Sequence, residues 1–192
     1  MKQVLKKGDN NMTNAVIIYG GNSKKSRLKG LFDKAEQYFK KENVLTETVF
    51  VSELPAEDLI SANFHSQEII KANEKVANAH IVVVLTPVYK AAYTGILKTY
   101  LDLLPQKGLQ GKTVVPLVLG GSFGHLLSID YAIKPVLSAL GATNILSGAY
   151  VIDIQVEKVN SEHYAIEDEI SERIDKLLAL SINEEKRTIP VN

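Results

Sequence analysis

The chain of 192 residues contains no cysteine. This absence excludes disulfide bonds, thiolate catalysis and cysteine-ligated zinc or iron–sulfur centres. If the protein carries out redox chemistry, the electrons must therefore reside on a bound cofactor. The histidines at positions 65, 80 and 163 show no spacing typical of metal ligands, so we expect no metal site.

An excess of charge and long apolar runs are also missing. Lys plus Arg and Asp plus Glu both number 22, so no long-range field attracts nucleic acid or an anionic membrane. Residues 1–13 are polar and rich in Lys and Asn, without the apolar core of a signal peptide. We expect a cytoplasmic protein that binds neither nucleic acid nor membranes, with a disordered extension over residues 1–13 and a single domain over residues 14–192.

Short apolar runs that alternate with helical patterns predict an α/β fold. Ala15–Tyr19, Ile81–Leu85 and Val114–Leu119 are continuously apolar, as strands buried on both faces are. Weaker strands fit Val44–Val51 and Thr143–Ile152, and apolar residues between the strands recur at helical spacing. The pattern predicts a flavodoxin-like, doubly wound sheet of five parallel strands in the order 2-1-3-4-5.

Two prolines and one apolar stripe lead to further expectations. Pro116 removes a hydrogen-bond donor from a central strand, so either the strand pairs poorly there or a bulge absorbs it. Pro135 cannot donate to the carbonyl of Tyr131, which predicts a kink or a one-residue π-bulge. An apolar stripe at helical spacing predicts a last helix from about Ser161 to Asn183; its residues are Ile166, Ile170, Ile174, Leu177 and Leu178.

The first of three unusual loops follows the first strand and reads Gly-Gly-Asn-Ser-Lys-Lys-Ser-Arg over residues 20–27. Its glycines allow a sharp turn, Ser23 and Ser26 add hydroxyl donors, and the start of the next helix adds partial positive charge. This combination suits a phosphate group, although the loop has neither a Walker motif nor the dinucleotide fingerprint. The composition equally fits an ordinary turn whose basic side chains are solvated.

The second loop, Thr86–Gly95, follows the most apolar strand. Pro87, Tyr89 and Tyr93 offer a flat, partly apolar wall of the kind that a planar heterocycle packs against. Thr94 can cap the helix that follows. The alternative is that both tyrosines are core or interface aromatics.

The third loop, Gly120–His125, has three glycines in five positions. Such glycines imply a close approach of the backbone to a neighbour, and backbone groups there can read the polar edge of a ring. His125 is a candidate contact for a ligand carbonyl or a nicotinamide phosphate, or else a helix cap or packed side chain. Because ligands bind outside the carboxyl ends of strands in such sheets, we expect the three loops to meet at one site.

The segments Thr86–Pro105 and Gly120–Leu140 closely resemble the NAD(P)H-dependent FMN reductases of the alkanesulfonate-utilisation type. The similarity extends over about Ala15–Ile152. The resemblance implies a flavodoxin-like homo-oligomer, a dimer or tetramer, that passes hydride from NADPH or NADH to FMN. It also implies release of reduced FMN to a partner FMN-dependent monooxygenase in sulfonate or sulfur assimilation.

The resemblance also implies the flavin contacts. Residues around Ser26 would hold the phosphate, the second loop would line the isoalloxazine ring, and the third loop would complete the site, with no catalytic acid required. The implied cofactor contacts are Gly21, Ser23, Ser26, Arg27, Pro87, Val88, Tyr89, Lys90, Gly120, Gly121, Ser122 and Gly124. A nicotinamide or interface role falls to Tyr93, His125 and Tyr131, the last at the π-helical position of the family's subunit interface.

The phosphate loop departs from the family pattern. Relatives carry Gly-Ser-x-Arg followed by Ser-x-Ser/Thr, whereas this chain has Gly-Gly-Asn-Ser and then Ser-Arg-Leu at residues 20–23 and 26–28. The positive charge is then expected from Lys24, Lys25 or Arg27. Two alternatives stay open: a quinone or azo reductase that retains its FMN, and a non-catalytic flavin-binding module.

Overall fold

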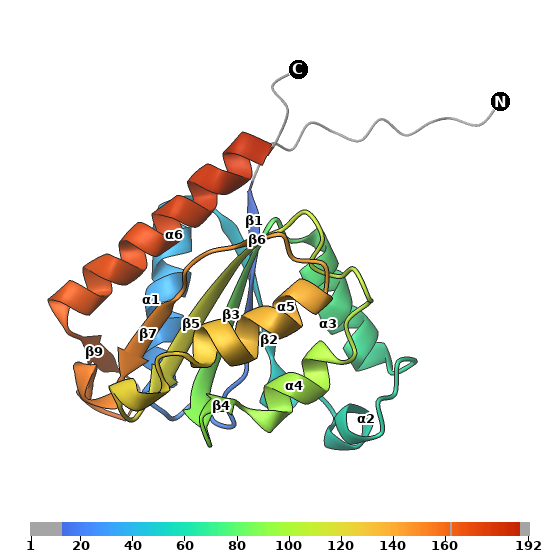
Figure 1. Cartoon of the computed structure of the whole chain (residues 1–192), viewed down its shortest axis with the longest axis horizontal. Helices are drawn as coiled ribbons and strands as arrows, with labels where there is room; N and C mark the ends of the chain where they lie inside the picture. Colours follow the sequence, from blue (N-terminus) through green and yellow to red (C-terminus); the bar gives the residue numbers. More distant parts are fainter. Residues whose placement is uncertain (1–12, 162, 189–192) are drawn as a thin grey trace.

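The computed structural model describes residues 13–161 and 163–188, which form a central sheet with helices on both faces (Figure 1). The sheet order is β2-β1-β3-β5-β6, with β7 also on β5 and β4 antiparallel to β3. The other pairings are parallel, which confirms the predicted order 2-1-3-4-5. The strands are β1 (Asn14–Tyr19), β2 (Leu45–Phe50), β3 (Ile81–Tyr89), β4 (Ala92–Tyr93), β5 (Thr113–Gly120), β6 (Asn144–Ile145) and β7 (Ala149–Ile152).

Residues 1–12 of the predicted N-terminal extension lie outside the described residues. Thr13 belongs to the described part, and its hydroxyl donates a hydrogen bond of 2.9 Å to Glu185 Oε2. The start of β1 is thereby connected to the carboxyl end of the last helix.

Helices bury apolar side chains on each face of the sheet. α1 (Leu28–Lys41) and α6 (Asp168–Thr188) cover one face, where Ile17 of β1 points. The opposite face, where Val16 and Ile18 point, is covered by α2 (Ala56–Ile60), α3 (Gln67–Asn78), α4 (Gly95–Leu101) and α5 (Lys134–Ala139). Successive strand residues thus enter different cores, which explains why the runs are continuously apolar. Within the described residues, no helix is long and apolar enough to cross a membrane.

Pro116 is accommodated by a bulge, one of the two outcomes expected for it. The register of β5 against its neighbour shifts by one residue between the pairs Val114↔Ile145 and Leu117↔Ala149. The Val114 carbonyl accepts from the Leu146 N–H, on the side of β5 that faces β6 and β7. Residue 116 lies two positions further along the strand, so the missing N–H of Pro116 faces that same side. The predicted fifth strand is accordingly two short strands, and no ladder donor is needed opposite the interruption.

The predicted start of the last helix is wrong. α6 begins at Asp168, and the preceding residues form the hairpin of β8 (Val156–Lys158) and β9 (Tyr164–Ile166). Ile166, which had been assigned to the helical stripe, pairs with Val156 and packs on the core below α1 and α6. Tyr164 and Ile166 are half-buried around exposed Ala165, which is the two-residue period of a strand.

The π-bulge predicted from Pro135 is confirmed. Residues Ile129–Ile133 form a π-helical turn directly before α5. The N–H of Lys134 donates to the carbonyl of Ile129, five residues earlier. Tyr131 lies on this turn with 78% of its surface exposed.

Candidate functional site

A cavity of about 270 Å³ lies at the carboxyl ends of the parallel strands, the end of the sheet near β4 in Figure 1. Segments after β1, within β3 and at the end of β5 all contribute to it. The lining residues are Gly21, Asn22, Ser23, Ser26, Arg27, Leu28, Pro87, Tyr89, Leu119 and Asp153. Six of the predicted site residues are among them: Gly21, Ser23, Ser26, Arg27, Pro87 and Tyr89.

The first loop turns tightly because its glycines leave room for neighbouring side chains. A Cβ on Gly20 would lie 2.8 Å from Leu97 Cβ, and one on Gly21 would lie 2.7 Å from both Leu28 Cδ2 and Tyr19 Cε1. The Gly20 N–H donates to Leu85 O at 2.7 Å, so the loop leaves the sheet beside β3. The loop can therefore pass close to the second segment of the site.

The three basic residues of this loop have different partners. Lys24 Nζ lies 2.5 Å from Glu53 Oε1 and 3.6 Å from the centre of the Phe50 ring, and it does not line the cavity. Lys25 is exposed outside the lining. Arg27 does line the cavity, and its Nε donates to the Val156 carbonyl at 2.9 Å. The other guanidinium N–H groups remain as donors, so Arg27 is the cation best placed to face a ligand.

The second loop is shorter than predicted because β3 continues through Tyr89. A two-residue turn at Lys90 and Ala91, with φ of 51° and 67°, joins β3 to β4. Positive φ at both central positions is the geometry of a tight hairpin and costs free energy in residues other than glycine. Pro87 and Tyr89 line the cavity, and Tyr89 is 55% exposed.

Thr94 connects the first and second loops. Its hydroxyl accepts from Leu97 N at 3.3 Å, which confirms the predicted helix cap, and donates to Gly20 O at 2.5 Å. Its N–H donates to Thr86 Oγ1 at 3.2 Å. Since Thr86 and Thr94 are buried, these bonds hold both loops in one relative position.

The third loop contributes less to the cavity than expected. Of the segment around it only Leu119 is a lining residue, and Gly120 is buried in β5 against the Tyr150 ring. The Tyr150 hydroxyl donates to Ser122 O at 2.7 Å. The glycine at position 120 therefore serves the close approach of a side chain of this protein.

The remaining predicted residues do not line the cavity. Val88 is half-buried and packs on the core, and Lys90 is exposed on its turn. Tyr93 is half-buried on β4 and His125 is exposed on a short 3-10 turn. Outside the lining are Val88, Lys90, Gly120, Gly121, Ser122, Gly124, Tyr93, His125 and Tyr131.

Sequence reasoning missed Asp153, a half-buried carboxylate at the end of β7 that lines the cavity. It also missed Asn22, Leu28 and Leu119. The position of Asp153 after the fifth strand is a signal that could have found it, because strand ends of parallel sheets share one edge. Burial, and secondarily the Asp153 charge, raises the pKa of the neighbouring Tyr150 phenol.

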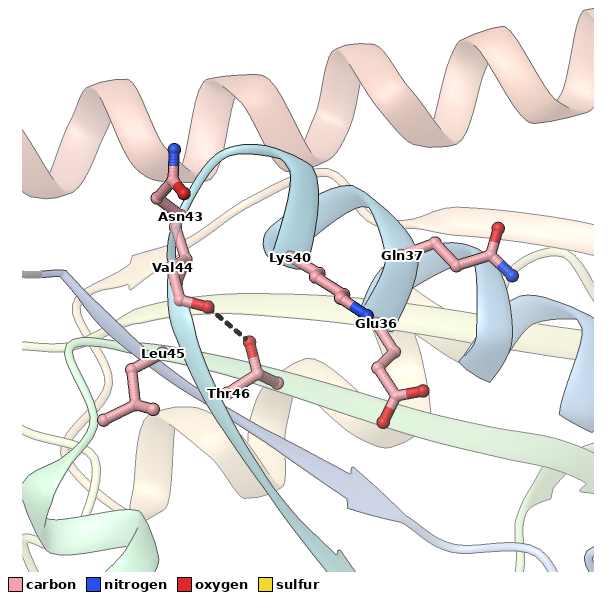
Figure 2. Close-up of a pocket in the computed structure, with 7 residues that line it drawn as sticks. All are labelled: Glu36, Gln37, Lys40, Asn43, Val44, Leu45 and Thr46. Atoms are coloured by element: carbon pink, nitrogen blue, oxygen red, sulfur yellow. Dashed lines mark hydrogen bonds between the residues drawn. The ribbon is translucent and has the colours of Figure 1, made fainter.

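A larger cavity of about 650 Å³ lies elsewhere, between the end of α1 and the start of β2 (Figure 2). Its lining includes Glu36, Lys40 and Leu45, and Thr46 Oγ1 donates to Val44 O at 3.1 Å. This end of β2 is its amino end, opposite the edge at which open parallel sheets bind ligands. We therefore place the candidate site at the smaller cavity.

The chain is similar to known FMN reductases over most of its length. The family model for NADPH-dependent FMN reductases matches residues 13–157. A protein of Pseudomonas putida named FMN reductase (NADPH) is 45% identical over 141 residues, covering 73% of this chain and 72% of that protein. A protein of the same name from Escherichia coli is 55% identical over 100 residues, covering 52% of each chain, so that match spans about half of the relative's length.

Among solved structures, the apo form of an NADH:FMN oxidoreductase, EMOB, superposes with a TM-score of 0.78 at 27% identity. The superposition covers 94% of this chain and 92% of that one. A flavodoxin from the domain Archaea, at 12% identity and a TM-score of 0.60, shares the fold.

Proposed function

The chain belongs to the NADPH-dependent FMN reductase family, and from that premise we propose that it transfers hydride from NADPH or NADH to FMN at the cavity described above. One observation carries the assignment of the site. Side chains from the loop after β1, from β3 and from the end of β5 line a single cavity at the carboxyl edge of the sheet. This edge, where the winding reverses between β1 and β3, is where doubly wound sheets bind nucleotides.

The donors of the first loop fit the FMN phosphate. Ser23 and Ser26 carry hydroxyl groups, Arg27 carries the cation, and α1 begins immediately afterwards at Leu28. Partial positive charge at a helix N-terminus and hydroxyl donors together favour a phosphate dianion. The altered loop lacks the arginine of the family pattern, but Arg27 brings one charged donor to the cavity.

The walls formed by β3 and β5 fit the flat ring. Pro87, Tyr89 and Leu119 are apolar or aromatic and lie on the same cavity. At about 270 Å³ the cavity is small for a whole nucleotide, so we assign it to the phosphate and the sugar-like chain, with the ring lying along exposed Tyr89. One face of the ring would then stay open to the nicotinamide.

In the proposed reaction the protein positions the flavin, and the flavin supplies the chemistry. When bound, FMN supplies the electron acceptor for the hydride. Pro87 and Tyr89 would set the plane of the isoalloxazine ring, and Arg27 and the two serines would hold the phosphate of FMN. No side chain has to gain or lose a proton.

We further propose that FMN is an exchangeable substrate whose reduced form leaves for a partner monooxygenase. One guanidinium, that of Arg27, lines the small cavity, and so does the carboxylate of Asp153. Like charge in the site lowers the affinity for a dianion. NADPH and NADH are regenerated in the cytoplasm, where we propose that the enzyme acts.

A second copy of the chain is the proposed partner in a dimer or tetramer. Four apolar or aromatic side chains are exposed in the third loop and in the residues that follow it: Phe123, Leu126, Leu127 and Tyr131. An exposed group of this kind is typical of an interaction surface. Light scattering of the purified protein tests this proposal, and a monomer at all concentrations would contradict it.

Oxidation of NADPH and of NADH, with and without added FMN, tests the proposed reaction. We expect oxidation that depends on added FMN and saturates with it, from a colourless preparation. A yellow preparation that keeps its flavin through dialysis and reduces quinones or azo compounds would favour the tightly bound alternative. FMN binding without nucleotide oxidation would identify a non-catalytic module.

A further inference from the structure

One backbone carbonyl in the first loop accepts two hydroxyl groups. The Ser23 carbonyl lies 2.9 Å from the Tyr19 hydroxyl and 3.2 Å from Ser26 Oγ, and both donate to it. The two hydroxyl oxygens are 3.4 Å apart. Ser26 lines the cavity, whereas Tyr19 lies beneath the loop with its side chain in the core.

A hydroxyl group has a single proton to donate. As the loop stands, the Ser26 proton is directed to the Ser23 carbonyl or to the Tyr19 hydroxyl oxygen, and in neither case is it available to a ligand. A phosphate oxygen is an acceptor, so Ser26 can bind it only by turning that proton away from the carbonyl. The Ser23 carbonyl then keeps a partner only if Tyr19 continues to donate to it.

Packing holds Tyr19 in the position from which its hydroxyl donates to the Ser23 carbonyl. Its ring lies 5.8 Å from Phe32 and 5.4 Å from Phe50, and it contacts the loop at Gly21. Tyr19 is fully buried as a residue, so the ring has little freedom to move when the loop changes partners. Burial also raises the pKa of the Tyr19 phenol further above neutral pH, so the phenol keeps the proton that it donates.

We propose that Tyr19 is a positioning residue for FMN: it keeps the Ser23 carbonyl paired, so that the Ser26 hydroxyl is released to the flavin phosphate. Tyr19 acts through Ser23 and Ser26 and does not touch the ligand. The proposal rests on the function proposed above, and it adds a residue from the end of β1 to the determinants of phosphate recognition.

FMN and riboflavin separate this role from a general effect on folding, because they share the ring and differ in the phosphate. In Tyr19→Phe the ring stays and the hydroxyl is lost. We expect the dissociation constant for FMN to rise about threefold to tenfold, the loss of one hydrogen bond, while that for riboflavin stays within about twofold. Flavin fluorescence titration measures both constants, and thermal unfolding checks that the variant is folded.

Tyr150→Phe is the matched control. Tyr150 is also buried and donates its hydroxyl to a loop carbonyl, that of Ser122 at 2.7 Å, but on the third loop. Removing this hydroxyl should change FMN and riboflavin affinities by the same factor. A selective loss of FMN affinity in Tyr150→Phe equal to that in Tyr19→Phe would overturn the proposal.

A double-mutant cycle tests the connection through Ser26. Ser26→Ala should lower FMN affinity selectively in the otherwise unchanged protein, and by less when Tyr19→Phe is already present. Equal effects in both backgrounds, or a Ser26→Ala variant that keeps the full preference for FMN, would overturn the proposal even without data on Tyr19→Phe alone.

The experiments distinguish a failure of the proposed function from a failure of the role proposed for Tyr19. If the unchanged protein binds FMN no better than riboflavin, the phosphate site in the proposed function is wrong and the role of Tyr19 falls with it. If the unchanged protein prefers FMN and Tyr19→Phe keeps that preference in full, only the role of Tyr19 is wrong.

Discussion

The Tyr150 side chain occupies the space that a side chain at position 120 would need, so only glycine fits at position 120. A Cβ at position 120 would overlap the phenol oxygen of Tyr150, which donates to Ser122 O across the end of β5. The neighbouring strands β5 and β7 place these residues side by side, with Gly120 opposite Ile152 in the register. The third loop therefore depends on a contact between residues that are 30 positions apart in the sequence.

Gly120→Ala is expected to push the Tyr150 ring away and break its bond to Ser122. Overpacking of this kind lowers the free energy of unfolding by about 1–3 kcal/mol. Gly124→Ala is the control, because the one described atom within 4 Å of its Cβ would be Ser122 Oγ, at 3.4 Å. Urea unfolding of both variants measures the difference, and equal stabilities would contradict the packing role of Gly120.

Gly148→Ala should destabilise the protein more than Gly111→Ala. Both glycines have positive φ, +82° and +74°, a conformation that costs about 1–2 kcal/mol for other residues. A Cβ at Gly148 would also lie 2.8 Å from Pro116 O, whereas none of the described atoms lies within 4 Å of one at Gly111. Thermal unfolding compares the two, and a smaller loss for Gly148→Ala would argue against the bulge as a rigid feature.

Arg27→Gln should weaken FMN binding about tenfold to a hundredfold, since hydrogen bonds to charged groups contribute about 1.5–3 kcal/mol. Lys24→Gln should change FMN binding less than about twofold, because Lys24 is paired with Glu53 and does not line the cavity. Titration at low and moderate salt measures both variants. The opposite ranking would show that Lys24 leaves Glu53 for the phosphate.

Asp153→Asn should tighten FMN binding about twofold to fivefold at low ionic strength, because a like charge is removed from the cavity that receives the phosphate. The gain should shrink as salt is added. Glu157→Gln removes an exposed carboxylate outside that cavity and is the control. Weaker FMN binding in Asp153→Asn would instead indicate that the carboxylate accepts a hydrogen bond from the flavin.

Lys112 leads to a prediction on pH. Its Nζ donates to Ala77 O at 2.8 Å and to Ala79 O at 2.5 Å, and burial lowers its pKa below the usual 10.5. Between the lowered folded pKa and 10.5 the unfolded chain binds more protons at this site, so its contribution to the free energy of unfolding rises with pH. Lys112→Met lacks that contribution. Urea unfolding from pH 8 to 10.5 should show the original protein gaining stability relative to the variant; a constant difference would contradict the shift.

Local patterns were sufficient for most of the fold. The strands β1, β3 and β5 each start within one residue of the predicted start. Pro135 predicts the π-helical turn because its missing N–H removes a hydrogen bond within the helix that contains it, which is a local effect. The start of α6 was missed because Ile166 fits both a helical and an alternating pattern, and its pairing with Val156 decides between them.

The sequence by itself determined the order of the elements, the loops that carry glycine and hydroxyl groups, and the similarity to a reductase family. Only the tertiary structure decided which side chains of those loops reach the cavity. It directs Lys24 to Glu53, joins Arg27 to Val156, brings Asp153 into the lining and places the Tyr19 hydroxyl under Ser23. The physical reason is range: helix and strand periodicity depend on residues a few positions apart, whereas Arg27 and Val156 are 129 positions apart and meet only in the folded chain.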